Sequence, residues 1–356
     1  AFTLFFRLYM LQIINVGPDE IDYWFSAKRL AGPGGYPELM HRTIRWSLIL
    51  PVAFFQLLLG SHPLLYYLTP ILNSLVQTVL LYYFGRKLFG RGIAFYAVIL
   101  FTAWPYMWRT GSQVRPAIFS LTYVLAAIFL LFIYLEKYGR RPEEKPGEGP
   151  SEGSGDMSGE QIAGGSGTAP RRSGALGALS VSFLGSVAFL FLAYESKITN
   201  LYFVPGVLIV LWIYTRNIRV PLLYGGYLFG LYVIEHLLYF ITVGEPLGRL
   251  GIIAKHHLTG DFAEDLPNGF FGLFARYTEY LEFPWHILLI AFVAATAYLL
   301  IKKKKWILEL TILHASFFFF LTFMVKSLNP MQPVEPFLDR YFIVNLPTMS
   351  LVVVYA

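Results

Sequence analysis

Three carboxylates follow one another closely after a short apolar segment near the start of the chain. They are Asp19, Glu20 and Asp22, in the sequence Gly-Pro-Asp-Glu-Ile-Asp. Proline suits the first position of a helix, and acids in the first turn are stabilised by the positive end of the helix dipole. The segment therefore predicts a helix that begins at Pro18. The acids are either ordinary helix-start residues or, at a membrane surface, candidate catalytic groups.

The composition is that of an integral membrane protein. The 356 residues are 56% hydrophobic and 14% charged, whereas soluble domains have about 45–50% apolar and about 25% charged residues. Alternation of apolar and polar residues at strand period is absent, which argues against a β-barrel. The absence of cysteine excludes disulfides and thiolate metal sites. No basic aromatic domain indicates nucleic-acid binding, so the net charge of +6 is interpreted as a topology signal.

The apolar runs predict an all-α polytopic membrane protein with about ten transmembrane helices. Amphipathic juxtamembrane helices are expected in the first outer loop, over 21–30 and 41–60, the second interrupted at Pro51. Both ends of the sequence lie in apolar runs, so we expect it to be a fragment of a longer chain. The expected spans are 2–16, 63–84, 93–108, 117–135, 176–194, 200–214, 220–243, 285–301, 306–325 and 341–356.

An abrupt change of composition divides the chain. Residues 139–174 are rich in Gly, Ser, Pro and Glu, which predicts a disordered cytoplasmic linker. No internal repeat is evident, which weakens the hypothesis of an inverted-repeat transporter. The segments around the linker are the N-terminal helices 1–138, with a catalytic first outer loop at 17–62, and the C-terminal helices 175–356, with outer loops at 244–284 and 326–340.

Charge distribution predicts the orientation in the membrane. If the acidic turn faces outward, every short basic cluster lies on the opposite side, in agreement with the positive-inside rule. The expected localisation is a prokaryotic inner membrane, with the active site on its extracytoplasmic face. The basic segments are Arg86, Lys87 and Arg91; residues 137–172; Arg216 and Arg219; and Lys302 to Lys305.

Other ionisable residues are expected on the same outer face as the acidic turn. Charged groups at span ends are costly unless they are paired or functional. Snorkelling of long side chains to the interface is the alternative for Lys197 and Arg340. The candidates for substrate binding are Tyr23, His41, Arg42, Arg45, Arg115 and Glu195.

A divalent metal ion is the one cofactor that the sequence suggests. His256 and His257 precede three carboxylates within 255–265, and with Asp19 they are candidate ligands. Adjacent histidines do not point the same way on a helix, so a solvated loop is the better interpretation of 255–265. No phosphate-binding glycine motif or hydrolase motif occurs.

An acidic residue near cations at a membrane surface suits sugar transfer from a polyprenyl-phosphate donor. The phosphate is already a competent leaving group, so the paired carboxylates of glycosidases are not required. One carboxylate would remove the proton from the acceptor, and cations or a metal would stabilise the departing phosphate. A flippase or transporter for a lipid-linked sugar would also need a cationic phosphate site, and is the alternative from another class.

Four ordered motifs resemble the C-type (GT-C) membrane glycosyltransferases, in particular the relatives of protein O-mannosyltransferases and of the lipid A aminoarabinose transferase. Each motif is short, but their order covers nearly the whole sequence. They are Pro18-Asp19-Glu20 with Tyr23 and Ala27; His41-Arg42 through Leu50-Pro51 to Leu59-Gly60; Tyr-Phe-Gly-Arg-Lys-Leu-Phe-Gly at 83–90; and Asp339-Arg340-Tyr341 before Leu346-Pro347.

The resemblance implies a catalytic carboxylate at Asp19, with Glu20 adjacent, and a lipid, glycan or protein acceptor beside membrane lipids. It also implies that Lys197, Arg340 and Tyr341 lie near the donor phosphate. Such enzymes often carry a second acid where this chain has Ala117. Ala117 therefore indicates a dispensable second acid, a variant branch or a noncatalytic relative. The alternative branch is that of the mannosyltransferases of lipid-anchor and N-glycan assembly.

Overall fold

The computed structural model describes residues 2–9, 18–32, 43–62, 65–138, 180–259, 269–279, 281–328, 331–333 and 339–356. This part of the chain is mostly α-helical, with short 3-10 turns (η) and one pair of strands. The elements are α1 (Phe2–Tyr9), α2 (Pro18–Ala31), α3 (Trp46–Leu59), α4 (Leu65–Phe89), α5 (Arg91–Thr102), α6 (Pro105–Thr110), α7 (Pro116–Tyr138), α9 (Val181–Ser196), η1 (Ile198–Phe203), α10 (Val204–Thr215), α11 (Arg219–Val243), α12 (Gly248–Thr259), α13 (Gly269–Glu279), α14 (Phe283–Ile301), α15 (Ile307–Phe323), β1 (Val325–Leu328), β2 (Met331–Pro333), η2 (Asp339–Tyr341), η3 (Ile343–Asn345) and α16 (Leu346–Tyr355).

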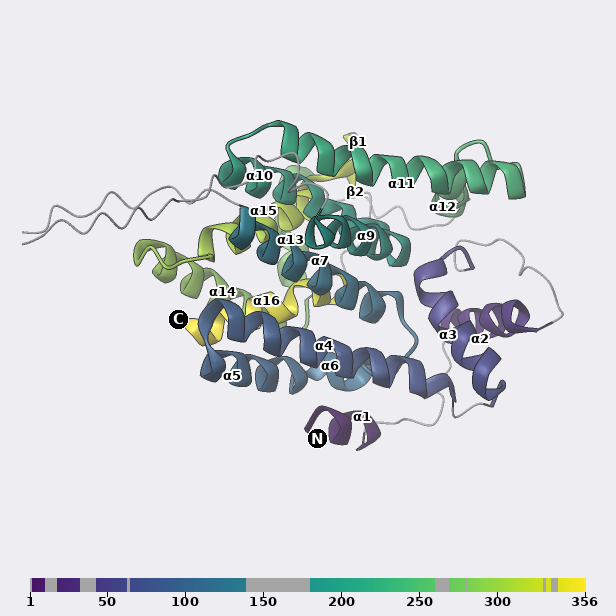
Figure 1. Cartoon of the computed structure of the whole chain (residues 1–356), viewed down its shortest axis with the longest axis horizontal. Coiled ribbons are helices and arrows are strands. Elements are labelled where there is room, and N and C mark those ends of the chain that lie inside the picture. The colour runs from purple at the N-terminus through teal and green to yellow at the C-terminus, as the bar shows by residue number, and fades with distance from the viewer. Residues whose placement is uncertain are drawn as a thin grey trace, which may run out of the picture.

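The long helices run side by side, so the chain has two distinct ends (Figure 1). The turns between α4 and α5, between α10 and α11, and between α14 and α15 lie together at the left of the view. These turns contain the basic clusters, so we call this the basic end. Helices α2, α3 and α12 lie at the right, which we call the α2 end. The arrangement places the acidic helix and the basic turns at opposite ends of the bundle, as the charge pattern predicts.

Three described helical segments are long and apolar enough to cross a membrane. They are Pro116–Tyr138, Ile198–Thr215 and Phe283–Ile301. Five further apolar helices are shorter, among them Val181–Ser196 and Ile307–Phe323. Helix formation satisfies backbone hydrogen bonds internally, which an apolar chain in lipid requires. The structure therefore supports a helical membrane protein, while the count of ten spans stays a prediction.

One expected span is divided in two. The sequence predicted a single segment over 93–108, but α5 ends at Thr102 and α6 begins at Pro105. Proline has no backbone N–H to donate and clashes with the preceding turn, so the helix stops and restarts with proline at its first position. The predicted linker, 139–174, lies outside the described residues. The predicted division of the chain on either side of it stays a prediction.

The expected interruption at Pro51 is wrong, because α3 is continuous from Trp46 to Leu59 with this proline inside it. A proline within a helix leaves the carbonyl four residues earlier without its usual donor. That carbonyl belongs to Ser47, and it accepts a 2.7 Å hydrogen bond from the hydroxyl of Tyr123 in α7. A tertiary contact thus supplies the hydrogen bond that the proline cannot donate. A local sequence pattern does not predict such a contact.

Two expected outer loops contain regular structure. The first, 244–284, contains α12 and α13, so the expectation of a solvated loop is wrong for 255–259, which belong to α12. The second, 326–340, contains strand residues, so the described part is not purely α-helical: β1 pairs antiparallel with β2, Leu328 facing Met331. Asn329 and Pro330 separate the strands in sequence, and this dipeptide favours a turn over a helix.

The core is built around α7, whose side chains are largely buried. It packs on α4 partly through buried polar groups. The Gln77 amide of α4 donates to the Ile118 carbonyl at 2.7 Å and to the Thr122 hydroxyl at 2.9 Å, and Asn73 donates to the same carbonyl. Hydrogen bonds of this kind join helices in an apolar medium. They fix α7, and with it the start of that helix at the α2 end.

Helices α10 and α15 approach closely at Gly206. A Cβ at this position would lie 2.9 Å from the Cβ of Ser316 and 3.1 Å from the Ile312 carbonyl oxygen. The Gly206 N–H also donates to the Ser316 hydroxyl at 3.0 Å, and that hydroxyl donates to the Tyr202 carbonyl. The small residue therefore allows the two backbones to meet.

We expect Gly206→Ala to lower the free energy of unfolding by about 1–3 kcal/mol, the usual cost of overpacking a filled contact. Gly226→Ala in α11 is the matched control, because nothing lies within 4 Å of a Cβ there. The control should be neutral or stabilise by about 0.5–1 kcal/mol, since glycine is a poorer helix former than alanine. Denaturant unfolding in detergent micelles measures both; equal effects would contradict close packing at Gly206.

Candidate functional site

The acidic segment forms the first turn of α2, which begins at Pro18 as the sequence predicts. Helix α2 packs against α3 through Tyr23 and Ala27, four residues apart, which are buried with Leu48 and Val52. Apolar residues at this spacing form one face of a helix, so they fix α2 against α3. Asp19 belongs to that first turn, although its side chain lies outside the described atoms.

Glu20 is a buried carboxylate with an arginine partner. The Nε of Arg115 donates to Glu20 Oε1 at 3.0 Å, and the Glu20 side chain is 5% exposed against 40% for Arg115. Arg115 directly precedes α7, so the pair joins the acidic helix to the start of the central helix. The structure therefore gives Arg115 and Glu20 a partner within the protein. Ala117 is buried two residues later.

Of the remaining candidates from the first loop and from 255–265, the structure describes the side chains of some and not of others. Arg45 precedes α3, and its Cζ lies 5.9 Å from the ring centroid of Tyr23. Tyr23 is buried, so its ring packs beside α3 and lies close enough to the Arg45 guanidinium for a cation–π contact. The candidates outside the description are His41 and Arg42 entirely, and His256 and His257 in their side chains.

Lys197 and Tyr341 are brought together from distant parts of the sequence. Lys197 is the residue directly after α9, and its Nζ lies 3.3 Å from the ring centroid of Tyr341. The same ammonium donates to the backbone carbonyl of Arg340 at 3.2 Å. The Arg340 side chain is exposed, and its Cζ lies 5.7 Å from the same ring. Two cations around one aromatic ring form a site that can bind an anionic group such as a phosphate.

Glu195 belongs to a buried charged cluster directly before Lys197. Its Oε2 lies 3.3 Å from Nη1 of Arg249 in α12, and the same nitrogen lies 3.9 Å from Oε1 of Glu235 in α11. All three side chains are less than a tenth exposed. Burial lowers the pKa of Arg249, but Glu195 and its other acidic and phenolic neighbours raise that pKa more, so the guanidinium is held charged. Glu195 is therefore an ion-pair partner of Arg249 within this cluster.

Helix α3 joins the acidic helix to the two cations. The hydroxyls of Ser47 in α3 and Ser196, the last residue of α9, are hydrogen-bonded at 2.7 Å. The indole of Trp46 donates to the Tyr239 hydroxyl of α11 at 2.6 Å, which in turn donates to the Ile44 carbonyl. Ser196 is the immediate neighbour of Lys197. The helix that carries the acids is thus held, through α3, against the chain segment that carries the first cation.

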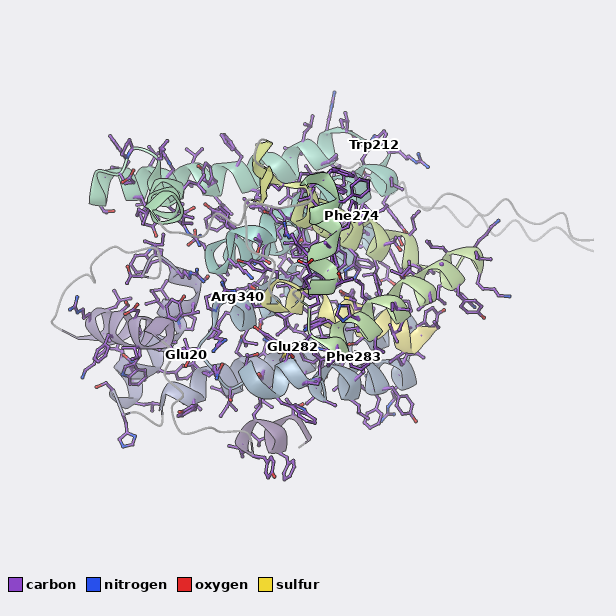
Figure 2. All side chains as sticks on the ribbon, turned by 180° about the vertical axis from the view of Figure 1, so that it is seen from behind. Glu20, Trp212, Phe274, Glu282, Phe283 and Arg340 are labelled. Atoms are coloured by element: carbon purple, nitrogen blue, oxygen red, sulfur yellow. The ribbon has the colours of Figure 1, made fainter. Side chains whose placement is uncertain are left out.

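Figure 2 shows how these parts lie in the whole molecule. Glu20 and Arg340 both lie toward the end that carries α2 and α3, away from the basic turns. The acids near the start of the chain and the cation near its end are separated by about 320 residues of sequence, Glu20 to Arg340. In the folded chain both lie on the α2 side of the bundle, Glu20 at its end and Arg340 nearer the middle (Figure 2).

Among the buried arginines that sequence reasoning missed are Arg249 and Arg7. Arg249 follows α11 in the sequence. One acid at the end of a span, Glu195, and one inside a span, Glu235, were a signal that a cationic partner was required. Arg7 lies in the first apolar segment, where its Nη1 donates to the Met107 carbonyl at 2.6 Å and its Nε donates to Ser74 Oγ at 3.2 Å. A charge inside an apolar run was the signal for Arg7.

A metal site finds no support among the described side chains. Within that part of the chain, no group of three or more His, Cys, Asp or Glu residues is arranged to hold a metal ion. The expected ligands Asp19, His256 and His257 have side chains outside the description. The metal hypothesis therefore stays a prediction from sequence.

The fold and the site define a class: a helical membrane protein with an acidic helix and a pair of cations at one end of its bundle. Residues 49–141 match the family model of dolichyl-phosphate-mannose-protein mannosyltransferase, a GT-C type glycosyltransferase family, which confirms the resemblance over that stretch. The match runs from α3 to the end of α7 and includes Arg115, but not Asp19, Lys197 or Arg340. Comparison with curated proteins gives no match, and neither does comparison with solved structures.

The ion pair of Glu20 and Arg115 predicts unequal costs for its two partners. Arg115→Gln removes the cation from a buried carboxylate and should lower the free energy of unfolding by about 1–3 kcal/mol. Glu20→Gln leaves a half-exposed guanidinium that water can solvate, so its cost should stay below about 1 kcal/mol. The double variant should resemble Glu20→Gln alone.

Denaturant titration in micelles, followed by tryptophan fluorescence, measures this asymmetry. Arg216→Gln at the exposed basic end is the control and should be neutral. Equal costs for the two single variants would show that the pair behaves as an ordinary surface ion pair.

Proposed function

We propose that the protein is a membrane glycosyltransferase that transfers a sugar from a polyprenyl-phosphate donor to an acceptor at the α2 end. The family match supports a membrane glycosyltransferase that uses a lipid-linked sugar donor. The name of the family specifies dolichyl-phosphate mannose, so a polyprenyl-phosphate mannose is the first donor to test. The acceptor is a lipid, glycan or protein hydroxyl or amine.

The observation that carries the proposal is the junction at the end of α9. The hydrogen bond between the hydroxyls of Ser47 and Ser196 holds α3, and with it α2, against the segment where Lys197 meets Tyr341 and Arg340. Group transfer from a lipid phosphate needs a base for the acceptor and cations for the departing phosphate, close together. The α2 end supplies both kinds of group from elements that are tied together.

In the proposed reaction, a carboxylate oxygen of Asp19 takes the proton of the acceptor while the acceptor oxygen or nitrogen attacks C1 of the sugar. The bond between C1 and the phosphate oxygen breaks, and its electron pair stays on the phosphate. Lys197 and Arg340 stabilise the charge that develops there. No protein acid is required, because the polyprenyl phosphate leaves as an anion.

Glu20 has a different role from Asp19 in this scheme. Its carboxylate is bound by Arg115 and is nearly inaccessible, so it positions the acidic turn rather than accepting the proton. Arg115 stands close to the place where related enzymes often carry a second acid, and the chain has Ala117 there. We propose that Asp19 alone acts as the base, with the ion pair of Glu20 and Arg115 positioning the acidic turn.

The proposed orientation places the α2 end on the extracytoplasmic side, in a prokaryotic inner membrane. The short basic turns lie together at the opposite end of the described helices (Figure 1). The positive-inside rule assigns such turns to the cytoplasmic side. Lys87 and Glu136 also pair at that end, between α4 and α7. Ten spans, with α2 and α3 as juxtamembrane helices, complete the proposed topology.

Asp19→Asn should cut single-turnover sugar transfer by a factor on the order of 10²–10⁴, the usual contribution of a positioned base. Donor binding should change little, because the amide keeps the size of the carboxylate. Glu20→Gln should reduce the rate less, and the matched control Asp22→Asn least. Rates are measured with radiolabelled donor in nanodiscs. A near-normal rate for folded Asp19→Asn would remove Asp19 from the mechanism and favour a flippase.

Lys197→Ala and Arg340→Ala should each weaken donor binding by about 10–100-fold, because each removes a charge-assisted contact to phosphate. Lys197→Arg should retain most of the affinity. Lys304→Ala at the exposed basic end is the control and should bind donor normally. Equilibrium binding of polyprenyl phosphate measures the affinities; unchanged binding in both alanine variants would locate the phosphate elsewhere.

A further inference from the structure

Arg249 directly contacts the last turn of α9, immediately before Lys197. The last carbonyls of a helix have no partner within it and need a donor from elsewhere. Arg249 Nη1 donates to the Tyr194 carbonyl at 3.2 Å, and Nη2 donates to the Glu195 carbonyl at 2.6 Å. Its guanidinium also lies 4.9 Å from the ring centroid of Tyr194. One buried side chain thus caps the end of α9.

The same guanidinium is held by two acids from different helices. Glu195 lies 3.3 Å from Nη1 and Glu235 of α11 lies 3.9 Å from it. Arg249 is 3% exposed, so these groups meet away from water, where salt screens an ion pair much less than at the surface. The cluster joins α9, α11 and α12 at the α2 end.

Helix α12 can place Arg249 at the end of α9 because its first residue is glycine. Gly248 has φ +54°, and a Cβ there would lie 2.6 Å from Nδ1 of His236 in α11. A side chain at 248 would therefore collide with α11 and hold α12 away. Both the conformation and the close approach need glycine at this position.

We infer that Arg249 is a positioning residue for donor binding, acting through Lys197. Its two hydrogen bonds fix the carbonyls of Tyr194 and Glu195, three and two residues before Lys197, and so define where the chain leaves α9. Lys197 adopts an extended conformation at that exit, with its ammonium above Tyr341. If the chain leaves α9 in another direction, the Lys197 ammonium no longer faces the donor phosphate. The inference rests on the proposed function, since it assumes that Lys197 binds the donor phosphate.

The test is a double-mutant cycle on phosphate binding, with the full chain in nanodiscs and undecaprenyl phosphate as the probe. Lys197→Ala should weaken binding by about 10–100-fold, and Arg249→Met by about 10-fold. The double variant should bind no more weakly than Lys197→Ala, within about twofold, because Arg249 acts through Lys197. Arg249→Lys, which retains one donor group and the charge, should recover part of the affinity.

Each alternative gives a different result. If Lys197→Ala binds normally, the proposed donor site is wrong. If Lys197→Ala weakens binding but the two single losses multiply in the double variant, Arg249 acts generally on the fold and the inference is wrong. Arg219→Met, an exposed arginine at the basic end, controls for loss of positive charge and should bind normally.

A second variant keeps the test valid if Arg249→Met does not fold. The triple variant Arg249→Met, Glu195→Gln, Glu235→Gln removes the whole buried charge cluster, and such neutral replacements are often tolerated. It also lacks both donors to the end of α9, so it should show the same loss of about 10-fold as the single variant. Wild-type affinity in the folded triple variant would overturn the inference.

Discussion

Capping of the backbone carbonyls at the end of α9 is the constraint on which the rest of the α2 end depends. A helix that stops inside an apolar bundle leaves carbonyls that water cannot reach. Here Arg249 donates to two of them, and Asn200 donates to the Ala193 carbonyl at 2.8 Å. The donors come from α12 and η1, so capping one helix also fixes two neighbouring elements.

The same junction organises the polar chemistry around it. Ser196 binds Ser47, which holds α3, and α3 carries α2 with its acids. Lys197 leaves α9 in an extended conformation and reaches Tyr341 near the C-terminal end of the described chain. In an apolar medium a small number of hydrogen bonds can determine such an arrangement, because the alternative is an unpaired polar group. The proposed base and cations are therefore positioned by groups that do not react.

Buried polar contacts recur through the bundle and have the same physical origin. Tyr123 supplies the bond that Pro51 denies to Ser47, and Gln77 binds α7 from α4. Arg7, in the first apolar segment, is held by Ser74 and the Met107 carbonyl. At the basic end the hydroxyl of Tyr214 donates to Glu309, an acid within α15. Each contact joins different helices, so polar groups specify how apolar helices pair.

The sequence by itself determined the class of protein, the start of α2 at Pro18 and the separation of acidic and basic ends, because these follow from composition, local geometry and charge. It also predicted a donor-phosphate site at Lys197, Arg340 and Tyr341; the structure brings these residues together, and their role stays a prediction. Only the tertiary structure decided that Arg115 pairs with Glu20, that α3 continues through Pro51 and that Arg249 caps α9. Those features depend on partners far away in sequence, and a local pattern shows that a group needs a partner without showing which residue supplies it.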